Sequence, residues 1–177
     1  MTRVASVIPF FKTKNLLKIV ATVCLMTSSA SLFAADEPAK AAPAAGPSPA
    51  KQAIAVRKAA FVLIANNFKP IGEVLQGKAP YNQAEIVKRA QRVAFLSELL
   101  DGTFPADSNL GAPDTKTKAE AFTNAADFEK LVREFQVNTK TLALVVAKES
   151  TASDAFKIAA KAVAEGCKGC HDKYKEK

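Results

Sequence analysis

Residues that commonly bind metals are scarce in this sequence of 177 residues. It contains one histidine, His171, and two methionines, both within the first 26 residues. Of its three cysteines, only Cys167 and Cys170 lie beyond the N-terminal segment that holds Cys24. Only these two cysteines remain beyond that segment, so no disulfide scaffold is needed, and the chain lacks the second pair of ligands that a structural zinc site needs. No stretch alternates apolar and polar residues convincingly, which argues against a β-sheet fold.

The first 34 residues predict a secretory signal peptide. They carry four basic residues and no acid, then an apolar run from Ile19 to Met26, then small residues up to Ala34. The alternative is a retained membrane anchor, but the uncharged stretch is short for a span of about 20 residues. Cys24 lacks a small residue just before it, which disfavours a lipoprotein anchor. We therefore expect export to the periplasm and no membrane attachment once the leader is removed.

Removal of the leader lowers the formal charge from +8 to +4, because 21 basic and 17 acidic residues remain. An excess this small, spread along the chain, does not indicate a nucleic-acid partner. Residues 35–50 are rich in alanine and proline and cannot bury an apolar face, so we predict a disordered linker there. The remaining residues, 51–177, fit a single domain.

The two late cysteines and the histidine stand together in the segment Cys167-Lys168-Gly169-Cys170-His171, the attachment pattern of a c-type haem. Thiols at positions i and i+3 of a helix point to one side, where both can form thioethers with the vinyl groups of one porphyrin. The histidine is then held against the iron as its axial ligand. A thioredoxin-like pair would instead sit at a helix N-terminus. A disulfide or a metal clip is the remaining alternative to haem.

The sequence offers no second strong ligand for such an iron. Met1 and Met26 both lie in the predicted leader, and His171 is the only histidine. The sixth position is therefore empty, filled by solvent or taken by a less usual donor such as a deprotonated lysine. An apolar wall opposite the histidine favours the empty state, since a water there would lack hydrogen-bond partners. We predict a five-coordinate, high-spin iron.

Apolar residues at helical spacing predict four amphipathic helices in the domain. Their expected ranges are 51–76, 82–100, 124–148 and 151–175. Asn82 with Glu85 is a capping signal for the second helix, and Thr151 with Asp154 for the fourth. The connection 101–123 is irregular, with a short helical turn expected near 116–121. Successive antiparallel helices bury their stripes as an up-down bundle, so the predicted fold class is an all-α antiparallel four-helix bundle with haem c near its C-terminus.

With these features the chain resembles the cytochromes c prime, the class II c-type cytochromes. The resemblance covers residues 51–177 and is carried by Cys167-Lys168-Gly169-Cys170-His171-Asp172-x-Tyr174 at the very end of a four-helix chain. Arg57, followed four residues later by Phe61, is similar to the family's arginine and apolar residue on the first helix. Thr103-Phe104-Pro105 resembles its aromatic-proline turn. Lys175 stands where many members carry an arginine.

The resemblance implies that the first helix forms the distal wall of the haem. Phe61 would then lie over the vacant coordination position, and Phe68, one heptad further along the same stripe, is a candidate for the same wall. Arg57 would bind a haem propionate, and Tyr174 and Lys175 would lie beside the haem. On the residues alone, Phe61 could equally be ordinary core, Arg57 a solvated helix residue and Tyr174 a side chain that closes the end of the bundle.

The missing sixth ligand favours a haem protein that binds small diatomic gases such as NO or CO and can also undergo electron transfer. A simple electron carrier of the same class is the alternative function. An enzyme is disfavoured, because a distal side without histidine has no obvious general acid or base. The expected partners are haem c, a diatomic gas and an unidentified redox protein. The resemblance also implies that the helices 51–76 and 82–100 could pair with a second copy in a homodimer.

Overall fold

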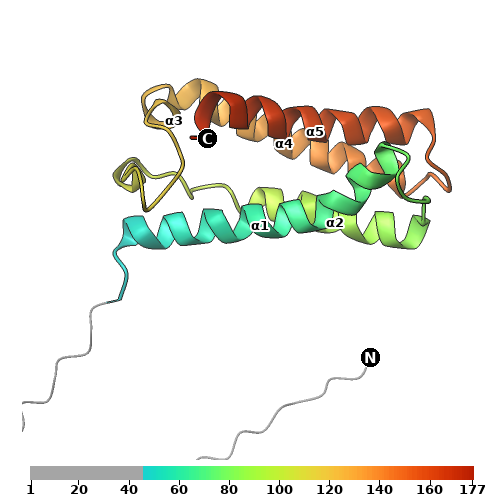
Figure 1. Cartoon of the computed structure of the whole chain (residues 1–177), viewed down its shortest axis with the longest axis horizontal. Coiled ribbons are helices and arrows are strands. Elements are labelled where there is room, and N and C mark those ends of the chain that lie inside the picture. Colours follow the sequence, from blue (N-terminus) through green and yellow to red (C-terminus); the bar gives the residue numbers. More distant parts are fainter. Residues whose placement is uncertain (1–45) are drawn as a thin grey trace, which may run out of the picture. The chain divides into compact units, whose positions relative to one another are not determined.

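The structure is a computed structural model that describes residues 46–177. The leader predicted for residues 1–34, and the linker predicted for residues 35–50 as far as residue 45, lie outside the described residues. Four long helices form a bundle (Figure 1): α1 (Pro49–Leu75), α2 (Gln83–Glu98), α4 (Ala125–Val146) and α5 (Asp154–Tyr174). Two short helical segments, η1 (Ala106–Ser108) and α3 (Glu120–Thr123), lie between α2 and α4.

Residues 46–177 contain no β-strand, only an isolated β-bridge. Over the same range, no helix combines the length and the apolar character that a membrane crossing requires.

Capping residues set the starts of α2 and α5. The predicted cap of α2 is confirmed, since the Asn82 side chain accepts a hydrogen bond of 3.1 Å from the Glu85 N–H. The predicted cap of α5 at Thr151 is wrong. Ser153 is the capping residue, and its hydroxyl accepts from the Phe156 N–H at 3.2 Å. Ser153 caps the helix because its side chain reaches the third N–H of the helix, a group that no residue inside the helix can satisfy.

Pro70 lies inside α1 and has no N–H to donate, so the carbonyl of Asn66 loses its partner within the helix. Arg89 from α2 replaces it, with its Nη1 3.4 Å from the Asn66 oxygen. The Nε of Arg89 also lies 2.7 Å from a carboxylate oxygen of Glu85. The helix continues past Pro70 to Leu75, and Figure 1 shows it bending in its last turns.

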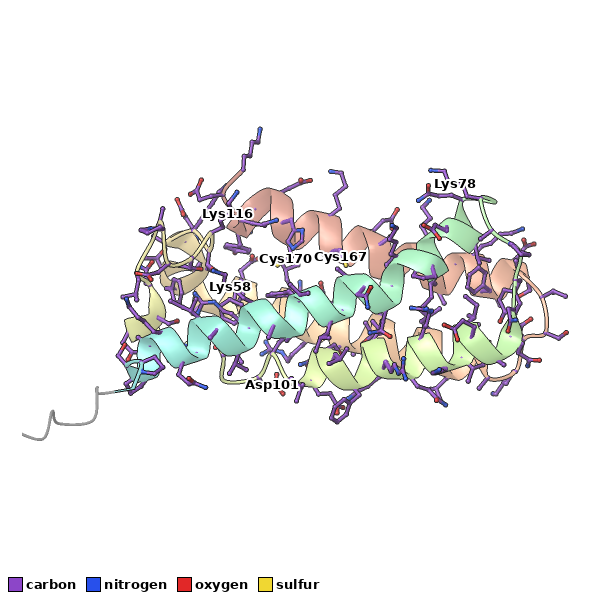
Figure 2. All side chains as sticks on the ribbon, turned by 60° about the horizontal axis from the view of Figure 1, so that its bottom comes forward. Lys58, Lys78, Asp101, Lys116, Cys167 and Cys170 are labelled. Atoms are coloured by element: carbon purple, nitrogen blue, oxygen red, sulfur yellow. The ribbon has the colours of Figure 1, made fainter. Side chains whose placement is uncertain are left out.

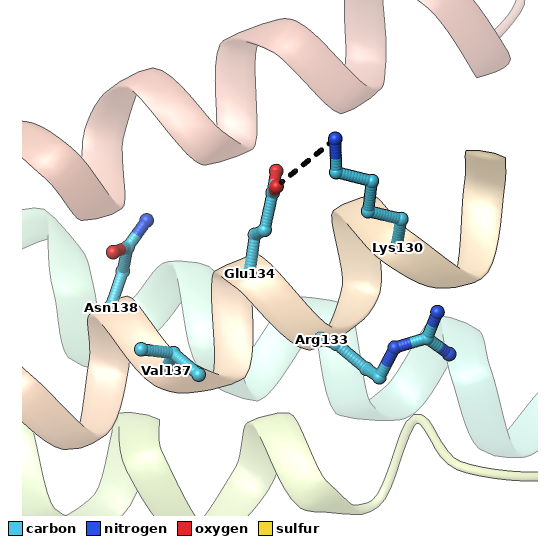
Figure 3. A pocket seen from close by; sticks show the side chains of 5 residues that line it. All are labelled: Lys130, Arg133, Glu134, Val137 and Asn138. Atoms are coloured by element: carbon cyan, nitrogen blue, oxygen red, sulfur yellow. Dashed lines mark ion pairs between the residues drawn. The ribbon is translucent and has the colours of Figure 1, made fainter.

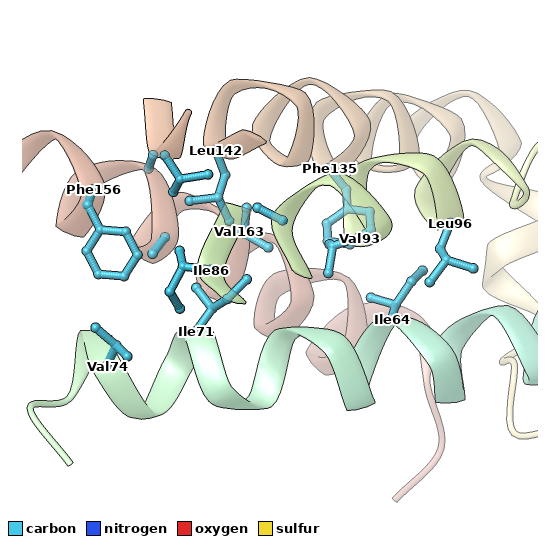
Figure 4. Packing of buried hydrophobic residues seen from close by; sticks show 14 of the residues in the cluster. Ile64, Ile71, Val74, Ile86, Val93, Leu96, Phe135, Leu142, Phe156 and Val163 are labelled. Carbon is cyan, nitrogen blue, oxygen red and sulfur yellow. The ribbon is translucent and has the colours of Figure 1, made fainter. Parts of the chain in front are cut away.

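The apolar stripes of the four long helices meet in one main core (Figure 4). Its fully buried members are Ile71, Ala90, Val93, Leu142, Val146, Phe156, Ala160 and Val163. Each of these comes from the helical spacing that the sequence shows, because residues three, four and seven apart share one side of a helix. The successive long helices α1, α2, α4 and α5 pack on one another in turn. This is the all-α antiparallel bundle that the sequence predicts.

The connection between α2 and α4 is irregular but firmly anchored. Gly102 and Gly111 adopt φ values of 71° and 66°, a conformation that residues with a side chain rarely take. The backbone of residues 116–118 pairs with that of residues 174–176 through two hydrogen bonds, of 2.9 and 2.8 Å. The connection therefore lies against the C-terminal end of α5, close to the Cys-x-x-Cys-His segment.

Candidate functional site

Cys167 and Cys170 lie almost one turn apart in the last part of α5, and neither is joined in a disulfide. Burial raises the pKa of the Cys167 thiol to about 11, and the neighbouring Cys170 adds to the shift. Burial also raises the pKa of Cys170. Both groups are therefore neutral thiols at pH 7, unlike the low-pKa thiolates of redox-active pairs. Two free thiols on one side of a helix suit thioether attachment.

His171 follows directly in the same helix. Its pKa is lowered, first by partial burial and then by the positive charge of Lys175, while Asp172 acts in the opposite direction. The imidazole is therefore neutral at pH 7 and keeps a lone pair for a metal. Among the described residues, no group of three histidine, cysteine, aspartate or glutamate side chains could hold a bare metal ion. Two thiols and one imidazole in this order are the donor set of a c-type haem.

The aromatic ring of Phe61 faces His171 from α1. The two ring centroids lie 6.4 Å apart, with an angle of 68° between the ring planes. Figure 2 shows Cys167 and Cys170 on the side of α5 that is turned towards α1. The contact between α1 and α5 is also less extensive than the contacts between successive long helices. The fold therefore brings the predicted axial ligand and the predicted distal residue together.

Gly169 lies within the Cys-x-x-Cys-His segment and Gly166 lies directly before it. A Cβ atom at Gly169 would meet nothing within 4 Å, and at Gly166 it would lie 3.6 Å from the ring of Phe135. A hollow of about 290 Å³ lies here between α4 and α5. Its lining residues are Leu131, Glu134, Phe135, Asn138, Ala162, Glu165, Gly166, Gly169 and Cys170. Gly169 thus leaves room for a bulky group attached at Cys170.

A larger hollow, of about 400 Å³, adjoins the first at Glu134 and Asn138 but has no residue of this segment in its lining (Figure 3). All its lining residues belong to α4: Lys130, Arg133, Glu134, Val137 and Asn138. Lys130 and Glu134 form an exposed ion pair across 3.7 Å at its rim. It is a shallow charged surface feature without a cysteine or histidine.

Arg57 is buried, with only 2% of its surface exposed, so the alternative of a solvated helix residue is wrong. Its guanidinium donates four hydrogen bonds to the connection between α2 and α4. The acceptors are the Thr103 carbonyl at 3.1 Å, the Ser108 hydroxyl at 2.7 Å, the Ser108 carbonyl at 3.3 Å and the Thr115 hydroxyl at 3.0 Å. Burial lowers the pKa of Arg57, yet an arginine stays charged at neutral pH. A bond to a haem propionate stays a prediction.

Tyr174 is buried at the end of α5. Its ring packs edge-on against Phe128, with centroids 5.2 Å apart, and its hydroxyl donates to Asp127 at 2.5 Å. It therefore closes this end of the bundle. The side chain of Lys175 is exposed, and Phe68 packs at the edge of the main core. The roles of Tyr174, Lys175 and Phe68 towards a haem stay predictions.

Sequence reasoning did not bring together the residues around Arg57. The ring of Phe104 lies 4.8 Å from the guanidinium carbon, 6.5 Å from the Phe61 centroid and 4.7 Å from the Phe128 centroid. Ser108 and Thr115 were not singled out at all. Serine and threonine in a connection rich in glycine and proline look like ordinary turn residues. Only the packing of distant segments shows that they are buried.

A four-helix bundle whose last helix ends in Cys-x-x-Cys-His defines a class, the helical c-type haem proteins. The family model described as cytochrome c' matches residues 52–175. The chain therefore belongs to the cytochrome c' family, which confirms the resemblance seen in the sequence. This family carries a covalent c-type haem, with which the Cys167 and Cys170 pair is consistent, and its members are extracytoplasmic in general.

Individual relatives match over nearly their whole length. A cytochrome c' of Allochromatium vinosum is 34% identical over 156 residues, which cover 86% of this chain and 98% of the relative. The structure of cytochrome c prime from Shewanella frigidimarina has a TM-score of 0.69 at 37% identity and covers 74% of this chain and 99% of that one. A nitric oxide complex of a mutant cytochrome c prime from Alcaligenes xylosoxidans has a TM-score of 0.66 at 27% identity, covering 74% and 98%. These likenesses confirm the four-helix fold.

Proposed function

We propose that this protein is a periplasmic c-type haem protein with a five-coordinate iron that binds small diatomic gases such as NO and CO. Cys167 and Cys170 would hold the haem covalently, and His171 would bind its iron. When bound, the haem supplies an iron with one open coordination position, which can take up a gas or exchange an electron. Side chains of this chain then decide what reaches that position.

The observation that carries the proposal is the pair of facing rings, Phe61 and His171, 6.4 Å apart. A flat group held by α5 and ligated by His171 would present its other side to Phe61. The chain has no other histidine, and no methionine after Met26, so neither usual second ligand is available from the described residues. Phe61 has no hydrogen-bonding group, so a water opposite His171 would gain nothing from it. These facts support an empty sixth position.

Phe61 would then select among ligands by the cost of moving its ring. The ring also contacts Phe104, so it cannot move away without breaking that aromatic contact. A small uncharged ligand with a strong bond to iron offsets this cost best. We expect NO to be less affected than CO because its bond to iron is stronger. The nitric oxide complex of the similar protein from Alcaligenes xylosoxidans supports a gas as the ligand.

The same surroundings argue against catalytic turnover, and we propose that the protein is not an enzyme. The aromatic neighbours of Phe61 are Phe104 and His171, and His171 is committed to the iron. Neither of these two rings thus provides a free general acid or base. Electron exchange with a redox protein fits the same site, since both cysteines are only half-buried.

The periplasmic location depends on the predicted leader. The family's extracytoplasmic character supports it, and so do the four basic residues and the apolar run of residues 1–34. Intact-mass measurement of the exported protein should give a mature N-terminus near Ala35. Retention of residues 1–34 would contradict this location.

We also propose a homodimer formed through α1 and α2. Exposed apolar side chains lie on both helices: Val56 and Leu63 are seven residues apart on α1, and Phe95 lies on α2, with the exposed Leu99 just beyond its end. Phe95 is 63% exposed, which is unusual for so large an apolar side chain. Sedimentation velocity should show a dimer that Phe95→Ser weakens. A monomer at every concentration would refute the dimer.

Absorption and electron-spin spectra of the purified holoprotein test the function. We expect high-spin spectra in both oxidation states at neutral pH, and a clear change of the ferrous spectrum when CO or NO is added. A low-spin ferrous spectrum without added gas would contradict the proposal, because it would mean that another donor occupies the sixth position. Spectra that do not change when CO or NO is added would leave simple electron transfer as the only remaining function.

A further inference from the structure

Phe61 is one member of a row of aromatic rings. Phe104 contacts Phe61 with centroids 6.5 Å apart and ring planes at 61°. Phe104 also contacts Phe128 more closely, with centroids 4.7 Å apart and ring planes at 66°. Phe61 thus has His171 as one neighbour and Phe104 as another. The freedom of Phe61 to move away from His171 therefore depends on how firmly Phe104 is held.

Arg57 holds Phe104 from a second direction. Its guanidinium carbon lies 4.8 Å from the Phe104 centroid, a distance that allows a cation–π contact. The same guanidinium bonds Thr103, the residue directly before Phe104 in the chain, at 3.1 Å. One buried side chain on α1 therefore fixes both the backbone and the ring at this point of the connection.

The remaining bonds of Arg57 make this arrangement hard to open. The guanidinium bonds Ser108 and Thr115, whose exposures are 0% and 5%. None of the ion pairs recorded within residues 46–177 involves Arg57, so neutral dipoles of one connection solvate its charge. Burying a cation is costly unless its hydrogen bonds are satisfied. Any swing of the connection would break these hydrogen bonds of the buried charge.

We infer that Arg57, Thr103, Ser108 and Thr115, here called the Arg57 clamp, hold Phe104 against Phe61 and so set how fast and how tightly a gas binds. The clamp residues are positioning residues, because they act on the ligand only through Phe104 and Phe61. The inference rests on the proposed function, since it requires a gas that enters past Phe61. The pairing of residues 116–118 with 174–176 anchors the far side of the same connection.

The clamp can be loosened from the connection, at residues that carry no predicted contact with the haem. Ser108→Ala and Thr115→Val each remove one hydroxyl acceptor of Arg57. Ser97 and Thr139 offer a matched control. Their hydroxyls lie 3.0 Å apart between α2 and α4, both residues are 0% exposed, and neither bonds to the clamp. Ser97→Ala/Thr139→Val should therefore lower stability in a similar way without releasing Phe104.

Two readouts on the holoprotein separate positioning from general loosening. Stopped-flow mixing of the ferrous protein with CO gives the association rate, and amide hydrogen exchange reports the connection itself. In Ser108→Ala/Thr115→Val we expect CO association to rise about fivefold, equivalent to about 1 kcal/mol. The N–H groups of Thr103, Ser108 and Thr115, which are bonded inside the connection, should lose protection. The control variant should show neither change.

A double-mutant cycle tests whether the clamp acts through Phe61. In a Phe61→Ala background, Ser108→Ala/Thr115→Val should add nothing further to the CO association rate. Phe104→Leu replaces the ring with a smaller apolar side chain and should behave in the same way. It can be used in place of the double variant if that variant folds poorly. Effects that simply add in the two backgrounds would overturn the inference.

The outcomes also distinguish the inference from the function on which it rests. If Phe61→Ala itself leaves the CO association rate unchanged, Phe61 does not control the entry of a gas. Both the proposed gating by Phe61 and the proposed role of the Arg57 clamp are then wrong. If Phe61→Ala speeds CO binding while Ser108→Ala/Thr115→Val and Phe104→Leu do not, the clamp alone is refuted, whatever the amide exchange shows. A faster CO rate in the clamp variants that disappears in Phe61→Ala is the result that supports it.

Discussion

The two ends of the bundle are built from different kinds of contact. Where α1 ends and α5 begins, aliphatic side chains and Phe156 fill the interior, and Phe156 is fully buried. Tyr81 closes this end by packing edge-on against Phe156, 5.2 Å between centroids, and by donating to the Glu149 carbonyl at 3.1 Å. We call this the aliphatic end.

The opposite end holds half-buried cysteines, a row of aromatic rings and the buried Arg57. Its own small cluster comprises Ala121, Phe128 and Tyr174, apart from the main core. We call this the cofactor end. The contrast shows that aliphatic packing gathers at one end of the bundle, while buried polar and aromatic groups gather at the end that carries the cysteines.

The largest effect should come from the attachment residues of the cofactor end. Cys167→Ser/Cys170→Ser removes both thioethers, so we expect complete loss of covalent haem, seen as absence of haem stain in a denaturing gel. Cys24→Ser is a matched control, because that residue lies in the predicted leader and should leave the stain intact. A stain that survives in the double variant would show that the haem is held in another way.

Mutations at the aliphatic end should change the stability of the protein and leave CO binding unchanged. Phe156→Ala removes a fully buried ring, and truncation of this kind typically costs about 3–5 kcal/mol. Urea unfolding of the holoprotein should show this loss. CO association in the folded variant should stay at the wild-type rate, since the aliphatic end lies far along the bundle from His171. A changed CO association rate would contradict the claim that the aliphatic end does not affect gas binding.

The sequence predicts the aliphatic end better than the cofactor end. Ile71 follows the helical spacing, and its burial needs only information that lies within one helix. The haem segment could also be predicted, because its residues are adjacent in the sequence. The burial and hydrogen bonds of Arg57 could not be predicted, since its acceptors lie 46 to 58 residues away in the chain. Such long-range partners follow from how the connection folds back on α1, and no local pattern encodes that.

The smallest effect concerns Asp127, which accepts hydrogen bonds from Lys173 and Tyr174 at the cofactor end. These bonds, first that of Lys173 and then that of Tyr174, lower the pKa of Asp127. A carboxyl whose pKa is lower in the folded state stabilises the fold above its unfolded pKa of about 3.9 and loses this effect as the pH falls further. Asp127→Asn should therefore lower Tm at pH 7.

The difference in Tm between wild type and Asp127→Asn should shrink as the pH falls below about 4. Thermal melts of both proteins between neutral pH and the acid limit check this. An equal difference at both extremes would mean that the charge of Asp127 plays no part at this end.

Phe61 is the residue through which the cofactor end is proposed to act on a gas, and Phe61→Ala is the most direct test of that claim. We predict that CO binds the ferrous variant about tenfold more tightly, a change of about 1.4 kcal/mol, and also faster. NO should change less. Phe156→Ala is the matched control, with the same side-chain truncation at the aliphatic end. If Phe61→Ala lowers Tm while CO affinity and association rate equal those of wild type, Phe61 is ordinary core and the proposed gating is wrong.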